Sequence, residues 1–260
     1  MKPGFYSLLT VLVLAGCGAT TDAPRDRDAA RIAEPPRDAS VSPRPRCDAG
    51  TYRRLRTRAS TPAAVVVRPT ATAPAPGAHA TARFGVRNVN GVPTVLGVLG
   101  ARLRHDCTPA WYRVQLPVKP NGATGWVRAG DVELGTVRAR IVVDLSERRV
   151  TLFRRGRPVF ATRAAVGSPA TPTPTGAFYV NQRLVPADAG GPFGPGAIGI
   201  SAFSEVLTGW VQGGPIAIHG TNRPDLIGKA VSNGCIRVRN DALRRLWRHA
   251  IAGTPVVVRA

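Results

Sequence analysis

The segment from His219 to Arg237 combines the residue types that acyl-transfer chemistry requires. His219 is followed by glycine, and Cys235 is preceded by glycine, within one short stretch of chain. A thiol nucleophile needs a base that removes its proton and backbone N–H groups that stabilise the oxyanion formed on attack. The segment can supply all three, so the sequence predicts a cysteine acyl-transfer enzyme with Cys235 and His219 as the reacting pair.

The first cysteine indicates export. Cys17 ends a Leu-Ala-Gly-Cys motif directly after the apolar run 8–13, which resembles a bacterial lipoprotein signal with the lipid on that cysteine. The run is too short to span a bilayer, and an ordinary secretory signal is the alternative. Both predict an exported protein that faces the cell wall or periplasm, and the lipid would anchor it to a membrane. Such a compartment permits disulfides.

The other cysteines separate into a candidate pair and a remainder. A bridge between Cys47 and Cys107 would close a loop of about 60 residues, worth at most about 4 kcal/mol on the chain-entropy model. Cys235 is then left as an unpaired thiol in an exported protein, which makes it a candidate reactive group. The alternative is a buried, inert cysteine, which the glycine and the polar residues beside Cys235 disfavour.

Charge and composition narrow the class of partner. The formal net charge is +21, and because only Lys2, Lys119 and Lys229 are lysines, arginine carries nearly all of it. Attraction to anionic wall polymers or lipid head groups is one interpretation, and the codon bias of a GC-rich genome is the other. Nucleic-acid binding fits poorly with export and with so few aromatic residues. Cys, His and carboxylate residues do not cluster at ligand spacing, so we expect neither a metal nor another cofactor.

The N-terminal part of the chain lacks the features of a folded domain. We expect a signal peptide over 1–16, and then the lipidated cysteine and a disordered tether over 17–61. Residues 18–46 mix Pro, Ala, Asp and Arg without an apolar period, and 48–61 is basic and expected to be mostly irregular.

A first folded module is predicted over 62–134. Short apolar runs alternate with turn residues, a pattern typical of a small β-barrel. The segment 125–132 resembles the closing strand of bacterial SH3-like modules, some of which bind wall peptides. Trp111, Tyr112 and Trp126 could form a ligand platform, although core packing is the simpler interpretation.

A second module is predicted over 137–260. It contains a β-hairpin, several further strands and a long Gly- and Pro-rich loop at 186–199, which is expected to be a lid or a substrate wall. Near the end, Leu243, Leu246, Trp247 and Ile251 mark one face of a short helix, with Asn240 as its expected N-cap. We therefore predict a mainly β domain with one short helix.

Several motifs of the second module occur together in one order. They are a hairpin ending at Leu152-Phe153, the Val166-Gly167 and Thr173–Gly176 turn, the triplet His219–Thr221 and the hexapeptide Ser232–Arg237. Together they resemble the YkuD-type catalytic domain of the L,D-transpeptidases of bacterial cell walls. The resemblance implies a β-sandwich domain that acts on peptidoglycan stem peptides. It also implies two-step acyl transfer, in which a cysteine thioester is resolved by the amine of a second stem to form a cross-link.

The resemblance also implies roles for individual residues. Cys235 would be the nucleophile and His219 the proton donor and acceptor. The carbonyl of Gly220 would orient the imidazole, and backbone N–H groups around Gly234 and Cys235 would form the oxyanion hole. Arg237 would contact the substrate or brace the active loop.

One position departs from the family pattern. Many members have a second histidine immediately before the Gly-Cys pair, where this chain has Asn233. Since an amide donates hydrogen bonds but does not exchange a proton at neutral pH, we assign Asn233 to positioning or to the oxyanion. Ser232 is assigned a supporting hydrogen bond.

Two other functions remain open on the sequence. Hydrolysis at the same site would make the protein an L,D-carboxypeptidase, with water in place of the acceptor amine. A non-catalytic wall-binding lipoprotein would use only the SH3-like module. The intact pair of Cys235 and His219 argues against this last interpretation.

Overall fold

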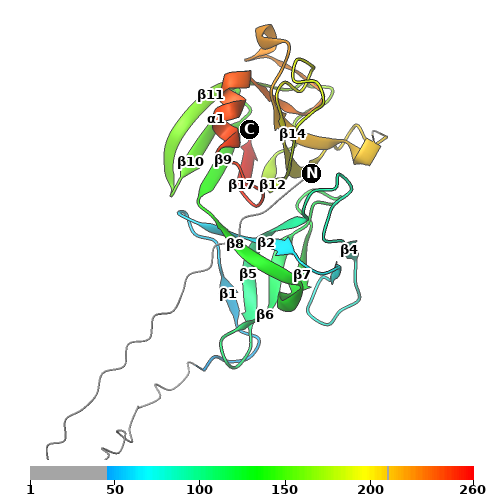
Figure 1. Cartoon of the computed structure of the whole chain (residues 1–260), viewed down its shortest axis with the longest axis vertical. Coiled ribbons are helices and arrows are strands. Elements are labelled where there is room, and N and C mark those ends of the chain that lie inside the picture. The colour runs from blue at the N-terminus through cyan, green and yellow to red at the C-terminus, as the bar shows by residue number, and fades with distance from the viewer. Residues whose placement is uncertain (1–45, 210) are drawn as a thin grey trace, which may run out of the picture. The chain divides into compact units, whose positions relative to one another are not determined.

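The computed structural model describes residues 46–260 except 210 (Figure 1). The predicted signal peptide, Cys17 and the tether up to residue 45 lie outside the described residues. The described part is mainly β, as predicted, and its one α-helix is α1 (Asn240–Trp247). Within that part, no helix has the length and apolar character that a membrane span needs.

The first sheet lies in the N-terminal half of the described chain. Its strand order is β7-β6-β5-β2-β8, and β1 pairs with β5. A separate hairpin joins β3 to β4, and a short 3-10 turn over Ala129–Asp131 leads into β8. The strands are β1 (Tyr52–Arg54), β2 (Thr61–Val66), β3 (Thr70–Thr72), β4 (Ala82–Phe84), β5 (Val95–Leu103), β6 (Pro109–Gln115), β7 (Thr124–Arg128) and β8 (Val132–Val137).

The segment 46–61, which the sequence placed in the disordered tether, belongs to this first module. Cys47 is disulfide-bonded to Cys107, which confirms the predicted pair, and β1 pairs with β5. The Arg56 guanidinium is largely buried and donates from Nε to the Val98 carbonyl at 2.6 Å. All three residues of β1 are exposed, so the strand leaves no apolar period in the sequence. The boundary predicted at residue 61 is therefore wrong.

The second sheet forms the C-terminal module. Its order is β10-β9-β17-β12-β13-β14-β16-β11-β15, and an additional pairing of β10 with β11 closes the sheet on itself. The expected two-layer arrangement thus takes the form of a closed sheet. The strands are β9 (Ala139–Asp144), β10 (Arg149–Arg154), β11 (Arg157–Gly167), β12 (Gly176–Leu184), β13 (Ala197–Phe203), β14 (Pro215–His219), β15 (Ala230–Ser232), β16 (Ile236–Val238) and β17 (Pro255–Arg259).

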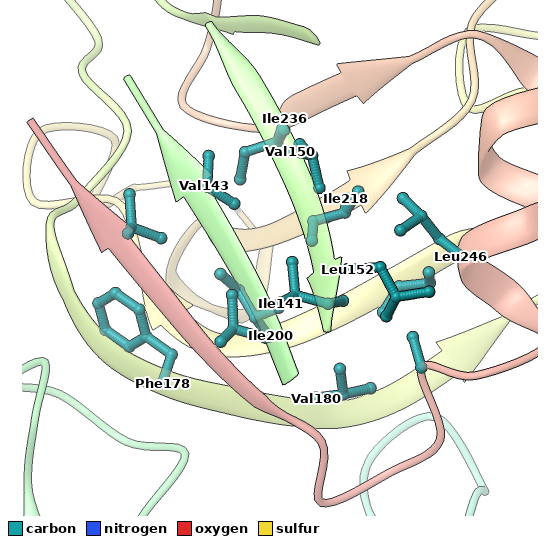
Figure 2. Close-up of a cluster of buried hydrophobic side chains, with 14 of the residues drawn as sticks. Ile141, Val143, Val150, Leu152, Phe178, Val180, Ile200, Ile218, Ile236 and Leu246 are labelled. Atoms are coloured by element: carbon teal, nitrogen blue, oxygen red, sulfur yellow. The ribbon is translucent and has the colours of Figure 1, made fainter. Parts of the chain in front are cut away.

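Branched aliphatic side chains fill the closed sheet. In β9, for example, Ile141 and Val143 are fully buried while Arg140 and Val142 are only partly so, which is the alternation of a strand with one face in a core. Figure 2 shows side chains from several strands and from α1 that meet in this cluster. They include Ile218 of β14, the strand that ends at His219, and Ile236 of β16, the strand that begins directly after Cys235.

The helix is shorter than its sequence pattern predicts. Leu243 and Leu246 are buried as expected, but α1 ends at Trp247. Ile251 lies beyond the helix and is exposed. Asn240 is the first helical residue rather than the N-cap, which is Arg239. The Asn240 side chain is engaged elsewhere, as described below.

The two modules share apolar and polar contacts. Ala63 and Val95 of the first sheet belong to the same buried cluster as the core of the closed sheet. The Gln115 side chain donates from Nε2 to the Ala177 carbonyl at 2.7 Å. Gly253, at φ +91°, lies so close to Ala63 that an added Cβ would fall 2.1 Å from the alanine Cβ. This close approach requires glycine at 253.

The disulfide provides a stability test. Replacing Cys47 and Cys107 together by serine removes the covalent link, which we expect to lower the free energy of unfolding by about 2–4 kcal/mol. Urea denaturation of the wild type and of the double variant measures the difference. Dithiothreitol should destabilise the wild type by a similar amount and leave the double variant unchanged. Equal stability of the two proteins would contradict a structural role for the bond.

Candidate active site

The pairing of β14 with β16 brings the predicted catalytic residues together. The two strands are parallel, with Ile218 opposite Ile236 and His219 opposite Arg237. Because side chains alternate along a strand, the isoleucines point into the core. His219, Cys235 and Arg237 then share the opposite face. The segment that the sequence singled out is thus folded into one constellation.

These side chains line a cavity of about 130 Å³. His219, Cys235, Arg237 and Asn233 contribute from the two strands and the turn before β16. The loop between β12 and β13 adds Phe193, whose ring centroid lies 4.9 Å from that of His219. The prediction that the 186–199 loop forms a wall of the site fits this contact, although 197–199 are the start of β13.

The orientation of the His219 ring is fixed by its own backbone. Nδ1 lies 2.6 Å from the Gly220 carbonyl oxygen. Because a carbonyl only accepts hydrogen bonds, Nδ1 carries the proton and Nε2 is left with a free lone pair. This is the tautomer that a general base needs. The carbonyl of Gly220 occupies the orienting position that the sequence predicted.

Burial keeps both reacting groups neutral. His219 is only 4% exposed, and desolvation lowers its pKa from 6.5 to about 4, against the hydrogen bond to Gly220. Desolvation also raises the pKa of the Cys235 thiol, although a backbone hydrogen bond with Ala217 and the charge of Arg237 oppose the shift. At neutral pH the resting pair is therefore thiol and imidazole rather than thiolate and imidazolium.

The turn before the nucleophile is held by Ser232. Its Oγ accepts a hydrogen bond from the Gly234 N–H at 3.2 Å and donates one to the Cys235 carbonyl at 2.5 Å. Gly234 has φ +100°, and an added Cβ would lie 3.0 Å from Ile216. Ser232 thus makes the supporting hydrogen bonds predicted for it. The Gly234 amide, which was expected in the oxyanion hole, is engaged by Ser232.

A second loop clamps the same turn from outside. Thr173 Oγ1 accepts a hydrogen bond from the Gly167 N–H and donates one to the Gly234 carbonyl, at 2.9 and 2.8 Å. Thr171 Oγ1 donates to the Ser232 carbonyl at 2.9 Å. The sequence showed the 173–176 turn as a motif but did not assign Thr173 or Thr171 to the site. Only the fold brings them to the nucleophile.

Asn240 secures the turn after His219. Its Oδ1 accepts a hydrogen bond from the Thr221 N–H at 2.8 Å. An added Cβ on Gly220 would fall 2.3 Å from the same oxygen. The residue expected to cap α1 therefore positions the turn that carries the His219-orienting carbonyl. Glycine at 220 is required by this close approach.

Asn233 and Arg237 complete the polar wall of the cavity. Asn233 is exposed at the tip of the turn, and its side chain lines the cavity. The Nε of Arg237 is buried without a hydrogen-bond partner among the described residues. A buried guanidinium N–H in this position is available to a ligand oxygen.

Comparison with known proteins places this site in a family. The model of the YkuD L,D-transpeptidase catalytic domain matches residues 138–258. The YkuD proteins of Bacillus licheniformis and Bacillus subtilis are 37% and 36% identical over 123 residues, which cover 47% of this chain and 67% of each relative. A solved catalytic domain of the E. faecium L,D-transpeptidase is 24% identical over 46% of this chain and 96% of that chain, with a TM-score of 0.35.

A half-buried free thiol beside an oriented imidazole defines a cysteine-dependent acyltransferase. The family match specifies the class further, because it covers both residues of that pair. The chain belongs to the YkuD family of L,D-transpeptidases.

The Thr173 clamp makes a testable contribution to the nucleophile. In Thr173→Val the Gly234 carbonyl and the Gly167 N–H lose their partners, which costs about 1–3 kcal/mol of unfolding free energy and loosens the turn that holds Cys235. We expect acylation of Cys235 by a carbapenem, followed by mass spectrometry, to slow at least about tenfold. Thr151→Val, a half-buried threonine of β10, is the matched control and should acylate normally. Equal rates in the two variants would show that the clamp does not position the thiol.

The lowered pKa of His219 predicts a specific acid sensitivity. In the unfolded chain the imidazole takes up a proton near pH 6.5, whereas in the folded protein it does so only near pH 4. Stability is therefore lost as the pH falls from 6.5 to 4, by up to about 3 kcal/mol from this residue alone. Urea denaturation at pH 7 and pH 4 should show a loss in the wild type that exceeds the loss in His219→Asn by about that amount. Identical losses in the two proteins would contradict a buried neutral imidazole.

Proposed function

We propose that the protein forms cross-links between peptidoglycan stem peptides through a thioester on Cys235. The observation that carries this proposal is the hydrogen bond between His219 Nδ1 and the Gly220 carbonyl, on the strand that pairs beside Cys235. It leaves Nε2 as the base on the face that the thiol shares.

The first step is acylation of the thiol. Sγ of Cys235 attacks the carbonyl between the L-centre of a diamino acid and the terminal D-alanine of a tetrapeptide stem. The thiol proton passes to Nε2 of His219, and the imidazolium then protonates the nitrogen of the departing D-alanine. The C–N bond breaks, and the thioester remains.

The second step transfers the acyl group. The side-chain amine of a second stem attacks the thioester and gives its proton to Nε2 of His219. When the C–S bond breaks, the sulfur recovers that proton and the cross-link is complete. Because burial lowers the pKa of the imidazole, the imidazolium is a strong acid that gives up its proton readily.

The wall of the cavity supplies the remaining roles. Asn233 can donate an amide hydrogen bond to the oxyanion. Arg237 can donate its unpaired Nε–H to a substrate oxygen. The proposal assigns substrate positioning to these two residues and proton transfer to His219 alone.

We also propose the location that this chemistry needs. A lipid on Cys17 would anchor the protein to a membrane, with the catalytic domain facing the wall or periplasm. The disulfide between Cys47 and Cys107 supports export, because such bonds persist in oxidising compartments. The first sheet is proposed to be an SH3-like module that assists at the wall.

Product analysis tests the proposal. The purified chain is incubated with a tetrapeptide muropeptide, and the products are separated and weighed by mass spectrometry. A cross-linked dimer with release of D-alanine is the expected result, and Cys235→Ala should abolish both. Release of D-alanine without a dimer would assign hydrolysis instead. Absence of both thioester and turnover in the wild type would refute the enzymatic function and favour the wall-binding lipoprotein.

A further inference from the structure

A larger cavity lies where the two modules meet. It has a volume of about 420 Å³, and we call it the junction cavity. The first module contributes the segment 83–95, which follows β3 and includes part of β4. The second module contributes Asn181 and Gln182 of β12, Phe203 of β13 and Pro215 of β14. Neither module forms this cavity alone.

The junction cavity adjoins the catalytic cavity. Pro215 lines both of them. Phe203 lines the junction cavity and pairs with Pro215 across the sheet, while the next residue, Ser204, lines the catalytic cavity. The two cavities are therefore neighbours at the ends of β13 and β14.

Polar contacts between the modules hold its walls in place. The Nδ2 groups of Asn88 and Asn90 both donate to Gln182 Oε1 at 2.9 Å. Gln212 Nε2 donates to Asn90 Oδ1 at 3.0 Å. Asn121 of the first module makes two hydrogen bonds of 2.8 Å with the backbone of Phe203. Walls that are already ordered cost little to organise when a ligand binds.

The lining points to the chemistry of the ligand. Arg83 and Arg87 are among the lining residues and none of the others is Asp or Glu, so the charge around the cavity is positive and favours a ligand with a carboxylate. Asn181 Oδ1 is buried without a hydrogen-bond partner within the described chain, so it can accept an N–H from a ligand. Phe84 and Phe203 add apolar surface. Carboxylate, N–H groups and apolar stretches occur together in a peptide.

We propose that the junction cavity binds the carboxylate-bearing part of a stem peptide whose reacting end lies at Cys235. This subsite rests on the proposed function, because the ligand is a substrate of that reaction. Donor and acceptor stems share the chemistry, and the experiment distinguishes them.

Binding is measured first, so that it does not depend on turnover. The Cys235→Ala form of the full chain is titrated calorimetrically with a tetrapeptide stem and with the same peptide amidated at its carboxylates. Adding Arg83→Glu should weaken binding of the first peptide about tenfold and affect the amidated peptide little. Arg113→Glu reverses the charge of an exposed arginine of β6 outside the cavity and should change neither affinity. Equal effects of the two reversals overturn the proposal.

A second variant tests the buried acceptor. Asn181→Leu removes the unpartnered oxygen at similar volume, so the free energy of unfolding should not fall, whereas the affinity for the tetrapeptide should drop severalfold. Unchanged affinity overturns the assignment of Asn181 to the subsite.

Kinetics in the active chain then identify the stem. In Arg83→Glu, a raised half-saturating concentration for single-turnover acylation of Cys235, measured without an acceptor, assigns the cavity to the donor. A raised KM for the acceptor alone in cross-linking assigns it to the acceptor. If the wild-type protein, which retains Cys235, binds the stem peptide but does not convert it, the proposed function fails while the subsite stands. Turnover that is equally insensitive to Arg83→Glu and Arg113→Glu removes the subsite and leaves the function intact.

Discussion

The parallel pairing of β14 with β16 is the constraint on which the site depends. Ile218 and Ile236 lie opposite each other and are fully buried in the core of the closed sheet. Their burial fixes the register of the two strands, because a slip by one residue would exchange the core and cavity faces. His219 and Cys235 therefore share a face as a direct result of aliphatic packing on the other side of the sheet. The relative position of the catalytic pair is therefore set by packing in the core.

Hydrogen bonds from polar side chains also hold His219 and Cys235 in position. Ser232 and Thr173 bond the turn before Cys235, and Asn240 bonds the turn after His219. These bonds fix backbone rather than reacting atoms. Desolvation then leaves the pair neutral, so the charge separation of attack arises only with the substrate in place. The resting pair is therefore uncharged, and its backbone is already held in place before a substrate binds.

Features held by contacts between residues close in sequence could be predicted, whereas features held by contacts between distant residues could not. The sequence grouped His219, Gly220 and Ser232 with Cys235, and the structure places them together, because their contacts are made within a few residues and leave local motifs. Thr173 was missed because its bond to Gly234 spans 61 positions. The strand β1 was missed because its stability comes from β5 and not from its own exposed residues. The Asn240 side chain was misassigned because a local capping pattern and a long-range bond look alike in sequence.

The bond between Cys47 and Cys107 also has a mechanical consequence. Any tension on the chain ahead of Cys47 reaches the folded part at that residue. From there the load passes through a covalent bond to the turn between β5 and β6, which bypasses the three-residue edge strand β1. Without the bond, the same pull would peel β1 from β5 one hydrogen bond at a time and would draw Arg56 from its buried position. A pulling force applied at Cys47 is therefore carried by the disulfide and does not unfold β1.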